Sequence, residues 1–388
     1  MSRKMGIFQY MLSVVEGLIS SGEFDCAILY FDNESPREFL KAKDIGNVAF
    51  IRLDGSHNNF LGKIKTAANV FLGKSVFTVN KLNKEAMENK NISLLIMPSP
   101  LLFGFEHNIP YIVPIPDMMY KYYPGLPEYS FYNNLISHFV FKYSAKYAVL
   151  CVADSEWGKN DIKKFLKQPA EKIKVIPFMP PGYIYEYKNM SFQEAENLLK
   201  KYNLPEKFIF YPAQFWTHKN HLRLVEAVKK AEDKYGQKIN LVLVGNEKAN
   251  EDNYLKIMRK AEDLGIRGRI FNLGYVPDKE IVALYKKSLA LCFCSLGGPT
   301  NIPIIEAMVL GVPVLCPDLF AMPDQVGEAG LLFDPFNHDD MAEKIHRVWT
   351  DENLRQKMID KGYEQVKSFT FEKCSALWIS AVKEALKI

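Results

Sequence analysis

The sequence predicts an α/β protein of two domains, each built on a parallel sheet that helices cover. The chain has 388 residues, which is more than one hydrophobic core ordinarily serves, so two domains of roughly 200 residues or fewer are expected. Its composition, 48% hydrophobic and 24% charged, is typical of a globular protein. Short β-branched runs recur along the chain with helical segments between them, and this alternation predicts parallel α/β sheets.

The first half alternates in this way but begins unusually. A doubly wound domain normally opens with a strand that runs into a glycine-containing turn, whereas Gly6 lies only a few residues after Met1. We therefore expect the usual first strand to be missing, shortened or replaced, and Met5 to Val15 to form an amphipathic helix. The candidate strands are Cys26 to Phe31, Val48 to Leu53, Ser93 to Met97, Tyr111 to Ile115, Tyr147 to Ala153 and Lys174 to Phe178.

The second half shows the clearer alternation, and it follows a proline-rich stretch at Pro177 to Pro181. Its strands are almost continuously apolar, as expected for a sheet buried on both faces. The candidate strands are Lys207 to Tyr211, Asn240 to Val244, Arg269 to Leu273, Ala290 to Cys294, Val312 to Cys316 and Gly330 to Phe333. The candidate helices are His221 to Tyr235, Glu251 to Leu264, Asp278 to Ser288, Ile302 to Leu310 and Asp339 to Trp349.

Charge and cysteine content exclude several classes of protein. A formal net charge of +4 is small for this length and argues against a strongly basic nucleic-acid binder. The six cysteines mostly lie in apolar runs without zinc-like spacing, so we expect buried, reduced thiols and a cytoplasmic location. Because no run of about 18 uncharged apolar residues occurs, we expect no membrane span.

A glycine-containing segment leads from a predicted buried strand into a predicted helix. It begins Gly297-Gly298-Pro299-Thr300-Asn301. Thr300 or Asn301 can cap the helix, and Pro303 is tolerated in its first turn. Unpaired N–H groups at such a helix start bind phosphate, and Glu306, about one turn further in, can reach a hydroxylated group attached to that phosphate. An ordinary capped helix with a solvated Glu306 is the alternative.

Two other loops follow strands at the same kind of position. Gln214 and Lys219 lie between the strand that ends near Tyr211 and the next helix, in the strand-end crevice where ligands of open α/β sheets collect. The lysine offers a compact positive charge for a diphosphate, and Gln214 can hydrogen-bond it. Gly245 and Gly274 end two further strands and would let the backbone approach a ligand. A solvated helix start and simple turns are the alternatives.

Together these segments resemble the retaining glycosyltransferases of family 4, and the similarity covers roughly Pro205 to Lys367. In that family a Gly-Arg-x4-Lys element contacts the donor diphosphate. Here Ala213 and Gln214 occupy the Gly-Arg positions, and Lys219 keeps the lysine. The departure at Gln214 bears on which donor is used.

The family's Glu-x7-Glu pair binds the donor sugar and the ribose. Glu306 matches the second glutamate, and Gly298 stands at the first position. Tyr275 and Val276 match the place where the family's backbone holds the nucleobase. A missing carboxylate at the sugar would alter selectivity.

The first half resembles the family less closely. The segment from Gly6 to Tyr10 is similar to the glycine loop that meets the donor diphosphate, and Pro114 to Tyr120 resembles an acceptor-side segment. Where many relatives place a histidine near the reacting sugar, Pro116 stands here, so Asp117 is the nearest polar candidate. A helix or turn cap is the alternative role of Asp117.

The resemblance implies a glycosyltransferase-B fold, with two Rossmann-like domains facing across a cleft. It places an acceptor-side domain at residues 1–180, a nucleotide-sugar donor domain at 181–368, and a helix that crosses back to the first domain at 369–388. The implied catalytic residues are Lys219, Glu306 and Asp117. The implied donor-binding residues are Gly6, Gln214, Lys219, Gly245, Tyr275, Val276, Gly298, Thr300, Asn301, Ile302 and Glu306.

The implied activity is transfer of a hexose from a nucleotide diphosphate sugar to a glycan or lipid-linked acceptor, with retention of configuration, in surface polysaccharide or lipopolysaccharide assembly. A lysine and helix-start N–H groups can stabilise the leaving phosphate without a metal, so no metal or cofactor is expected. Two alternatives stay open: a nucleotide-sugar epimerase of the same architecture, and a non-catalytic relative that binds sugar nucleotides or glycans.

A lysine-rich stretch offers a possible contact with a membrane. Leu61 to Lys84 contains no Asp or Glu, and an apolar face with lysines can lie on anionic lipid. The protein would then act at the inner face of the membrane; a solvated helix face is the alternative. The lysines concerned are Lys63, Lys65, Lys74, Lys81 and Lys84.

Overall fold

The structure, a computed structural model, forms two compact α/β units, and every strand pair that it describes is parallel. This confirms the predicted fold class. The residues described are 6–30, 48–54, 60–77, 79–129 and 131–387. Unit 1 comprises residues 1–116, 132–177 and 371–388, and unit 2 comprises residues 117–131 and 178–370.

Unit 2 is built on a six-stranded sheet in the order β12-β11-β10-β7-β8-β9. Strand β7 pairs with β8 on one side and with β10 on the other, so the strand order reverses between β7 and β10. The four inner strands, β11, β10, β7 and β8, are buried on both faces, which explains their almost continuous apolar sequence, whereas the edge strands β12 and β9 are partly exposed. The six strands are β7 Ile209–Pro212, β8 Leu241–Val244, β9 Ile270–Asn272, β10 Ala290–Cys292, β11 Val314–Pro317 and β12 Gly330–Phe333.

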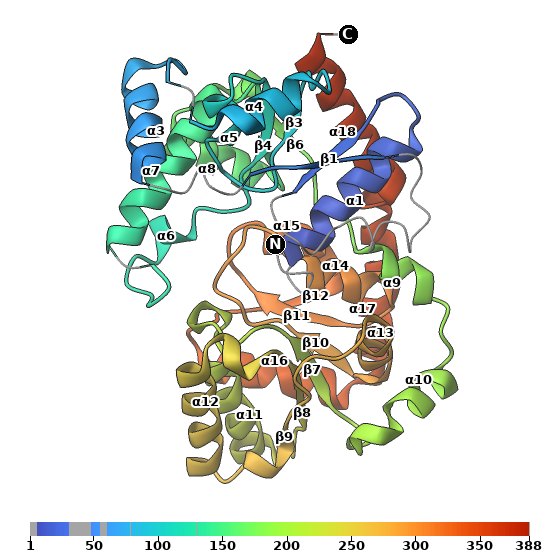
Figure 1. Ribbon diagram of the computed structural model, residues 1–388. Coiled ribbons are helices and arrows are strands. Elements are labelled where there is room, and N and C mark those ends of the chain that lie inside the picture. The colour runs from blue at the N-terminus through green and yellow to red at the C-terminus, as the bar shows by residue number, and fades with distance from the viewer. Residues whose placement is uncertain (1–5, 31–47, 55–59, 78, 130, 388) are drawn as a thin grey trace. The chain divides into compact units, whose positions relative to one another are not determined.

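Helices cover both faces of this sheet. Helices α11, α12 and α16 lie on one side of it, and α13, α14 and α17 lie on the other (Figure 1). Helix α11 ends at Gly236, whose φ of 69° gives the left-handed C-cap that glycine favours. The helices are α6 Met119–Tyr122, α9 Gly182–Tyr187, α10 Phe192–Leu199, α11 His221–Tyr235, α12 Glu251–Asp263, α13 Asp278–Lys287, α14 Ile302–Val309, α15 Met322–Val326, α16 His338–Thr350 and α17 Glu352–Gln365.

Unit 1 places its described strands in two sheets, a four-stranded one in the order β3-β4-β5-β6 and a separate pair, β1-β2. The strands are β1 Ala27–Tyr30, β2 Ala49–Arg52, β3 Leu95–Ile96, β4 Tyr111–Pro114, β5 Leu150–Ala153 and β6 Ile173–Val175. The helices are α1 Gly6–Ser20, α3 Phe60–Leu72, α4 Lys81–Glu88, α5 Phe103–Glu106, α7 Phe131–Tyr147, α8 Glu156–Leu166 and α18 Phe371–Leu386. Each predicted strand is found, and α1 confirms the helix expected near the N-terminus.

Unit 1 joins the two ends of the chain, because α18 packs against α1 (Figure 1). Gly17 lets the two helices approach closely: a Cβ atom there would lie 2.4 Å from Ser375 Oγ. Trp378 is fully buried beside Tyr10, with 6.4 Å between the ring centroids. The C-terminal helix is therefore part of the core of unit 1.

The sequence predicted buried, reduced cysteines and no membrane-spanning helix. The cysteines are free thiols and are buried, except that Cys26 is only partly buried. No helix within the described residues combines the length and the apolar character that crossing a membrane requires.

We expect Trp378→Ala to lower the free energy of unfolding of unit 1 by about 3–5 kcal/mol, because it leaves a cavity where a large ring is fully buried. Urea denaturation followed by circular dichroism measures this. Leu377→Ala, at the exposed neighbouring position, is the control and should change stability by about 0.5 kcal/mol or less. Equal effects of the two substitutions would contradict the packing of α18 described here.

Candidate active site

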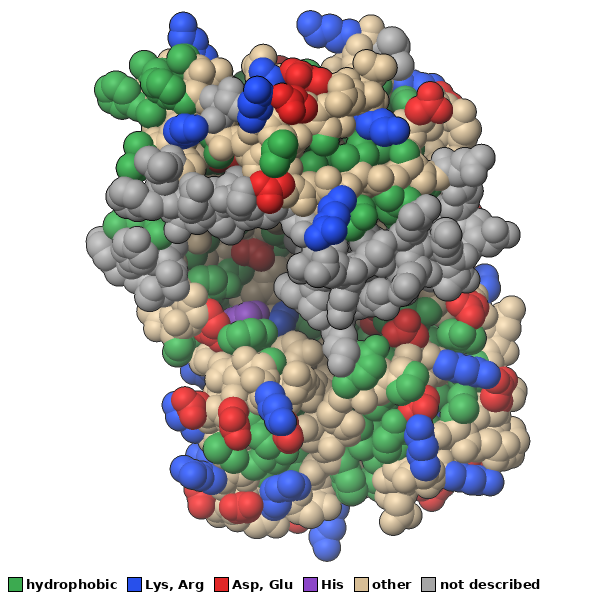
Figure 2. Space-filling model, in the orientation of Figure 1, with side chains coloured by type: hydrophobic (Ala, Val, Ile, Leu, Met, Phe, Trp, Pro, Cys, Tyr) green, Lys and Arg blue, Asp and Glu red, His purple; other side chains and the backbone are tan. Residues whose placement is uncertain are grey.

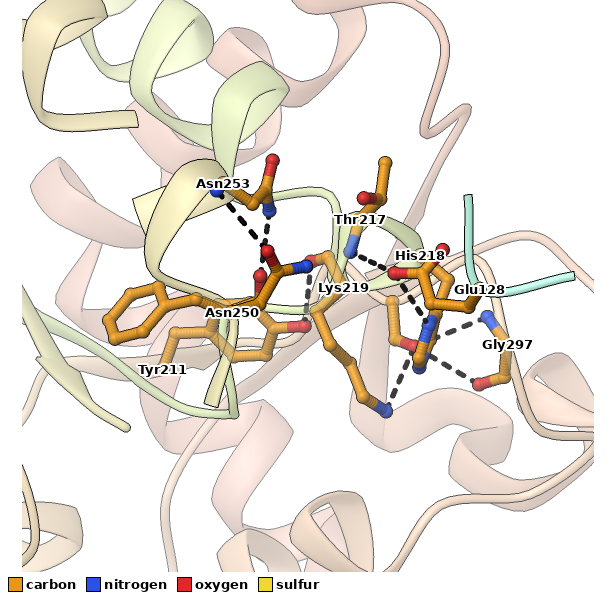
Figure 3. A network of polar contacts seen from close by, with 10 residues as sticks. Glu128, Tyr211, Thr217, His218, Lys219, Asn250, Asn253 and Gly297 are labelled. Carbon is orange, nitrogen blue, oxygen red and sulfur yellow. Dashed lines mark hydrogen bonds and ion pairs between the residues drawn. The ribbon is translucent and has the colours of Figure 1, made fainter. Parts of the chain in front are cut away.

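The loops that follow β7 and β10 meet where the strand order reverses. In open α/β sheets this switch point leaves a crevice at the carboxyl ends of the strands, and ligands bind there. The two loops are joined directly, because Leu296 N–H donates to the His218 carbonyl at 2.7 Å. Figure 3 shows the polar network around this junction. The sequence placed most of its donor-site residues on these two loops and on the helix that follows the second, and the others at Gly6 and on the loops after β8 and β9.

Lys219 lies at the centre of the junction. It ends the short 3₁₀ helix Thr217–Lys219, and the hydroxyl of Tyr211 on β7 donates to its carbonyl at 2.9 Å. Its Nζ donates to Ser295 Oγ at 3.2 Å, across to the loop after β10 (Figure 3). The surrounding protein lowers the pKa of Lys219 to about 8 by desolvation, and the charge of Asp117 partly opposes this shift. The ammonium is therefore still mostly protonated at pH 7, and it can bind an anion.

The segment 117–131 packs on this junction and belongs to unit 2. The Glu128 carboxylate accepts the backbone N–H of Thr217 and lies 3.6 Å from His218 Nδ1. Burial lowers the pKa of His218 to about 4, so the ring is neutral at pH 7. The Asp117 carboxylate accepts the N–H of Met119 at 3.0 Å, and burial raises its pKa. In the structure Asp117 thus caps its own turn, the alternative role that the sequence left open.

The loops after β7 and β8 are also tied together. Gln214 Oε1 accepts the backbone N–H of Asn246 at 3.0 Å. Gly245 is required for this approach, because a Cβ atom there would lie 2.4 Å from the Ala213 carbonyl oxygen. The Gln214 side chain therefore has a structural partner, which the sequence did not indicate.

The start of α14 differs from an ordinary capped helix. Asn301 is the N-cap residue, with φ of −142°, but its side chain does not cap the helix. Its amide Nδ2 instead donates to the Gly298 carbonyl at 3.3 Å. Gln325 holds the Asn301 backbone from both sides, accepting its N–H at 2.9 Å and donating to its carbonyl at 2.8 Å. With no side-chain cap on its first turn, α14 keeps helix-start N–H groups that suit a phosphate.

Gly298 has a φ of 90°, in the region that side chains of L-residues rarely adopt. A Cβ atom there would lie 2.9 Å from Asn301 Oδ1. The backbone of this loop therefore disfavours a glutamate at position 298. Thr300, two residues on, is buried, and Ile302 opens α14 with a partly buried side chain.

Glu306 is buried and held by two tyrosines. Tyr183 of α9 donates its hydroxyl to Oε1 at 3.0 Å, and Tyr285 of α13 donates to Oε2 at 2.8 Å. Burial raises the pKa of Glu306 to about 7, although both hydrogen bonds act to lower it. The alternative of a solvated glutamate is wrong.

The loop after β9 leads into α13, the helix that carries Tyr285. Tyr275 is 57% exposed, whereas the Val276 side chain is buried and can offer a ligand only its backbone. Tyr275 interacts electrostatically with Tyr183, which in turn hydrogen-bonds Glu306. Gly274, with φ of 66°, makes the turn that presents Tyr275. An exposed aromatic ring of this kind suits a nucleobase.

Unit 2 thus brings together most of the predicted site. Gly6 is the first residue of α1 in unit 1, and its surroundings lie outside the described part of the structure. Among the described residues, no group of three or more His, Cys, Asp or Glu side chains is arranged to hold a metal ion. Sequence reasoning missed partners that come from distant segments or carry no local pattern: Glu128, Tyr183, Tyr285, Ser295 and Gln325.

Comparison with known proteins identifies the class of this fold and finds a family model that matches much of the second half. Residues 194–365 match the family described as Glycosyl transferases group 1. A glycosyltransferase from Rickettsia africae superimposes with a TM-score of 0.75 at 18% identity, covering 99% of this chain and 96% of that one. Anabaena HepE in complex with UDP and glucose gives a TM-score of 0.76 at 16% identity, covering 99% and 97%.

The fold is therefore the glycosyltransferase-B fold, as the sequence predicted. The match to the group 1 family covers residues 194–365, which is less than half of the chain.

Curated relatives match at lower coverage. O-antigen chain mannosyltransferase B of Escherichia coli is 28% identical over 238 residues, which is 61% of each chain. The serotype-specific mannosyltransferase WbdA of the same species is 23% identical over 280 residues, 70% of this chain and 33% of that one. The chain thus spans about three fifths and one third of the lengths of these two relatives.

We expect Glu306→Gln to stabilise the protein at neutral pH, because the folded state holds the Glu306 pKa at about 7 against 4.5 for an ordinary glutamate. A raised folded pKa gives the wild type stability that is complete below pH 4.5 and is lost as the pH rises to 7. The advantage of the glutamine variant should therefore grow between pH 4.5 and 7 and then level off, at a size on the order of 3 kcal/mol.

Melting temperatures of the two proteins between pH 4.5 and 8.5 measure this difference, in which the titration of other groups largely cancels. A difference in melting temperature that stays constant across this range would show that Glu306 is not a buried carboxyl with a raised pKa.

Proposed function

We propose that the protein is a glycosyltransferase that moves a hexose from a nucleotide diphosphate sugar to a glycan or lipid-linked acceptor. One observation carries the proposal: the Lys219 ammonium and the uncapped start of α14 both follow strands at the switch point of the sheet. A cation and helix-start N–H groups are the elements that bind a diphosphate. The group 1 glycosyl transferase domain supports this assignment.

In the proposed reaction the diphosphate leaves as the glycosidic bond breaks, and its growing negative charge must be stabilised. Lys219, whose pKa is about 8 without ligand, would be held protonated by that charge. The N–H groups at the start of α14 point partial positive charge at the same place. We propose that these groups suffice without a metal ion. The Lys219 ammonium and the start of α14 would both act where the leaving diphosphate develops negative charge.

The nucleoside would lie toward Glu306 and Tyr275. Glu306 accepts two tyrosine hydroxyls, and a ribose diol can replace or join them as donor. Tyr275 offers an exposed ring for the base. We propose that transfer retains the anomeric configuration, with attack from the face that the diphosphate leaves and one of its oxygens taking the acceptor proton.

The relatives suggest where to search for sugar and acceptor. Two of them are named mannosyltransferases, one of the O-antigen chain. We therefore propose mannose as the first hexose to test and a growing surface polysaccharide as the acceptor. In that process the enzyme would work at the cytoplasmic side of a membrane, which it would touch peripherally through the Lys63 to Lys84 region.

One observation favours a second candidate, a non-catalytic sugar-nucleotide-binding relative. Position 298, where the resemblance implies a carboxylate at the donor sugar, is a glycine whose φ of 90° disfavours any other residue. Such a protein would bind the donor and transfer nothing. An epimerase of this architecture would instead interconvert sugar nucleotides in the absence of acceptor.

We expect one nucleoside diphosphate among UDP, GDP, ADP and dTDP to raise the melting temperature of the wild type. A ligand at about 100 times its Kd stabilises a protein by roughly 2.7 kcal/mol. Lys219→Met should abolish the shift by removing the ammonium, whereas Lys230→Ala, an exposed lysine of α11, should leave it intact. A shift that survives Lys219→Met would place the diphosphate elsewhere.

We expect EDTA to change neither this thermal shift nor the rate of sugar transfer, because lysine and helix-start N–H groups are proposed to neutralise the diphosphate. Transfer is measured with GDP-mannose and the other common sugar nucleotides against mannose-containing oligosaccharide acceptors. Loss of transfer in EDTA, restored by Mg²⁺ or Mn²⁺, would refute the metal-independent mechanism. Donor binding without any transfer would favour the non-catalytic relative.

A further inference from the structure

The last turn of α3 and the turn that follows it in unit 1 present four large apolar side chains to solvent. We call this set, Phe71, Leu72, Val76 and Phe77, the apolar tip. Phe71 is 91% exposed, and the other three are between 45% and 50% exposed. Hydrophobic side chains gather on the surface where α3 ends, at the upper left of Figure 2. A contiguous exposed apolar patch of this kind marks an interaction surface.

The apolar tip is held in this arrangement by buried polar groups. Asn69 is fully buried, and its Oδ1 accepts the N–H groups of Val76 at 2.9 Å and Phe77 at 2.8 Å. Its Nδ2 donates to the Phe77 carbonyl at 2.7 Å. Ser75 Oγ is anchored to the Glu106 carbonyl at 2.8 Å. The exposure of these rings is therefore a property of the folded turn, and collapse onto the core would break these hydrogen bonds.

Lysines predominate among the charged side chains around the apolar tip. Lys74 lies inside it and is exposed, and Lys65 lies two turns earlier on α3. No Asp or Glu occurs between Leu61 and Lys84. Glu106 is a neighbouring carboxylate that accepts the Thr66 hydroxyl at 2.5 Å, and this hydrogen bond leaves its negative charge in place. Lysines around exposed apolar side chains are the combination that anionic lipid surfaces attract.

The structure changes which lysines of this region can contribute. Lys81 and Lys84 lie on α4 and pair with Glu85 and Glu88 at 3.5 and 3.7 Å. Their charge is thus locally balanced, which makes α4 the solvated face that the sequence offered as an alternative. The side chain of Lys63 lies outside the described residues.

We propose that the apolar tip inserts into the interfacial region of a bilayer that contains anionic lipid, with Lys65 and Lys74 among the headgroups. This deepens the proposed function, because it would bring the enzyme to a lipid-linked acceptor, but it rests on different residues from the donor site. A bilayer fits better than a protein partner, since apolar side chains at the end of a turn can enter a fluid interface without a complementary groove.

Flotation with vesicles of phosphatidylethanolamine and phosphatidylglycerol, compared with vesicles of phosphatidylcholine alone, tests the proposal. The full-length wild type should float with the anionic vesicles, and high salt should weaken this binding. The double variant Phe71→Ser and Phe77→Ser should lose binding by about tenfold or more, because it removes two rings that would be buried in lipid. Lys74→Glu should weaken binding to anionic vesicles several-fold.

Matched controls distinguish an effect of the apolar tip from an effect of exposed apolar side chains in general. Leu82→Ser on α4 and Phe192→Ser on α10 remove side chains that are 64% and 61% exposed, and both variants should float like the wild type. Because these side chains are roughly half exposed or more, the melting temperatures should change little. Transfer to a water-soluble acceptor, measured in parallel, should be unaffected, so failure here is distinguishable from failure of the proposed function.

Three results would overturn the proposal. One is the absence of flotation with anionic vesicles, and a second is flotation that the double variant leaves unchanged. The third is self-association of the wild type that the double variant abolishes, without vesicle binding, because it would show that the apolar tip contacts a second copy of the chain.

Discussion

The site depends on the order of the strands in unit 2. Because β7 pairs with β10, two loops that are about 80 residues apart in the chain emerge side by side at the carboxyl edge of the sheet. One loop carries Lys219 and the other leads into α14. No local sequence could bring these groups together. The helices that cover both faces of the sheet fix the two loops, so the site has a rigid base.

Burial shifts the pKa values of the two charged groups of the site in opposite directions. Desolvation lowers the pKa of Lys219 to about 8 and raises that of Glu306 to about 7. Each group is therefore closer to losing its charge at neutral pH than it would be in water, which costs the ligand-free protein stability. A diphosphate would stabilise the ammonium, and hydroxyl donors would stabilise the carboxylate. Groups whose pKa values are shifted by burial, and whose charged forms a ligand would stabilise, are typical of a binding site rather than of a structural core.

Much of the fold followed from the sequence, because hydrophobic periodicity is a local signal. The helix predicted at His221 to Tyr235 has those bounds in the structure, and each predicted strand is found within a few residues. The division of the strands of unit 1 into two sheets was not predictable, since pairing is set by tertiary contacts. The same holds for Tyr183, which meets Glu306 from 123 residues away. The sequence showed only that a glycine replaces the first glutamate of the Glu-x7-Glu pair, and the φ of 90° at Gly298 shows that this loop has a backbone conformation that favours glycine.

The central claim is that a nucleotide diphosphate binds at the switch point of unit 2. A crystal structure of the protein with the nucleoside diphosphate that binds it tests this most directly. We expect phosphate oxygens within hydrogen-bond distance of Lys219 Nζ and of the first N–H groups of α14, with the ribose hydroxyls at Glu306. A nucleotide bound anywhere else, with Lys219 still on Ser295 and Glu306 still held only by its two tyrosines, would contradict it.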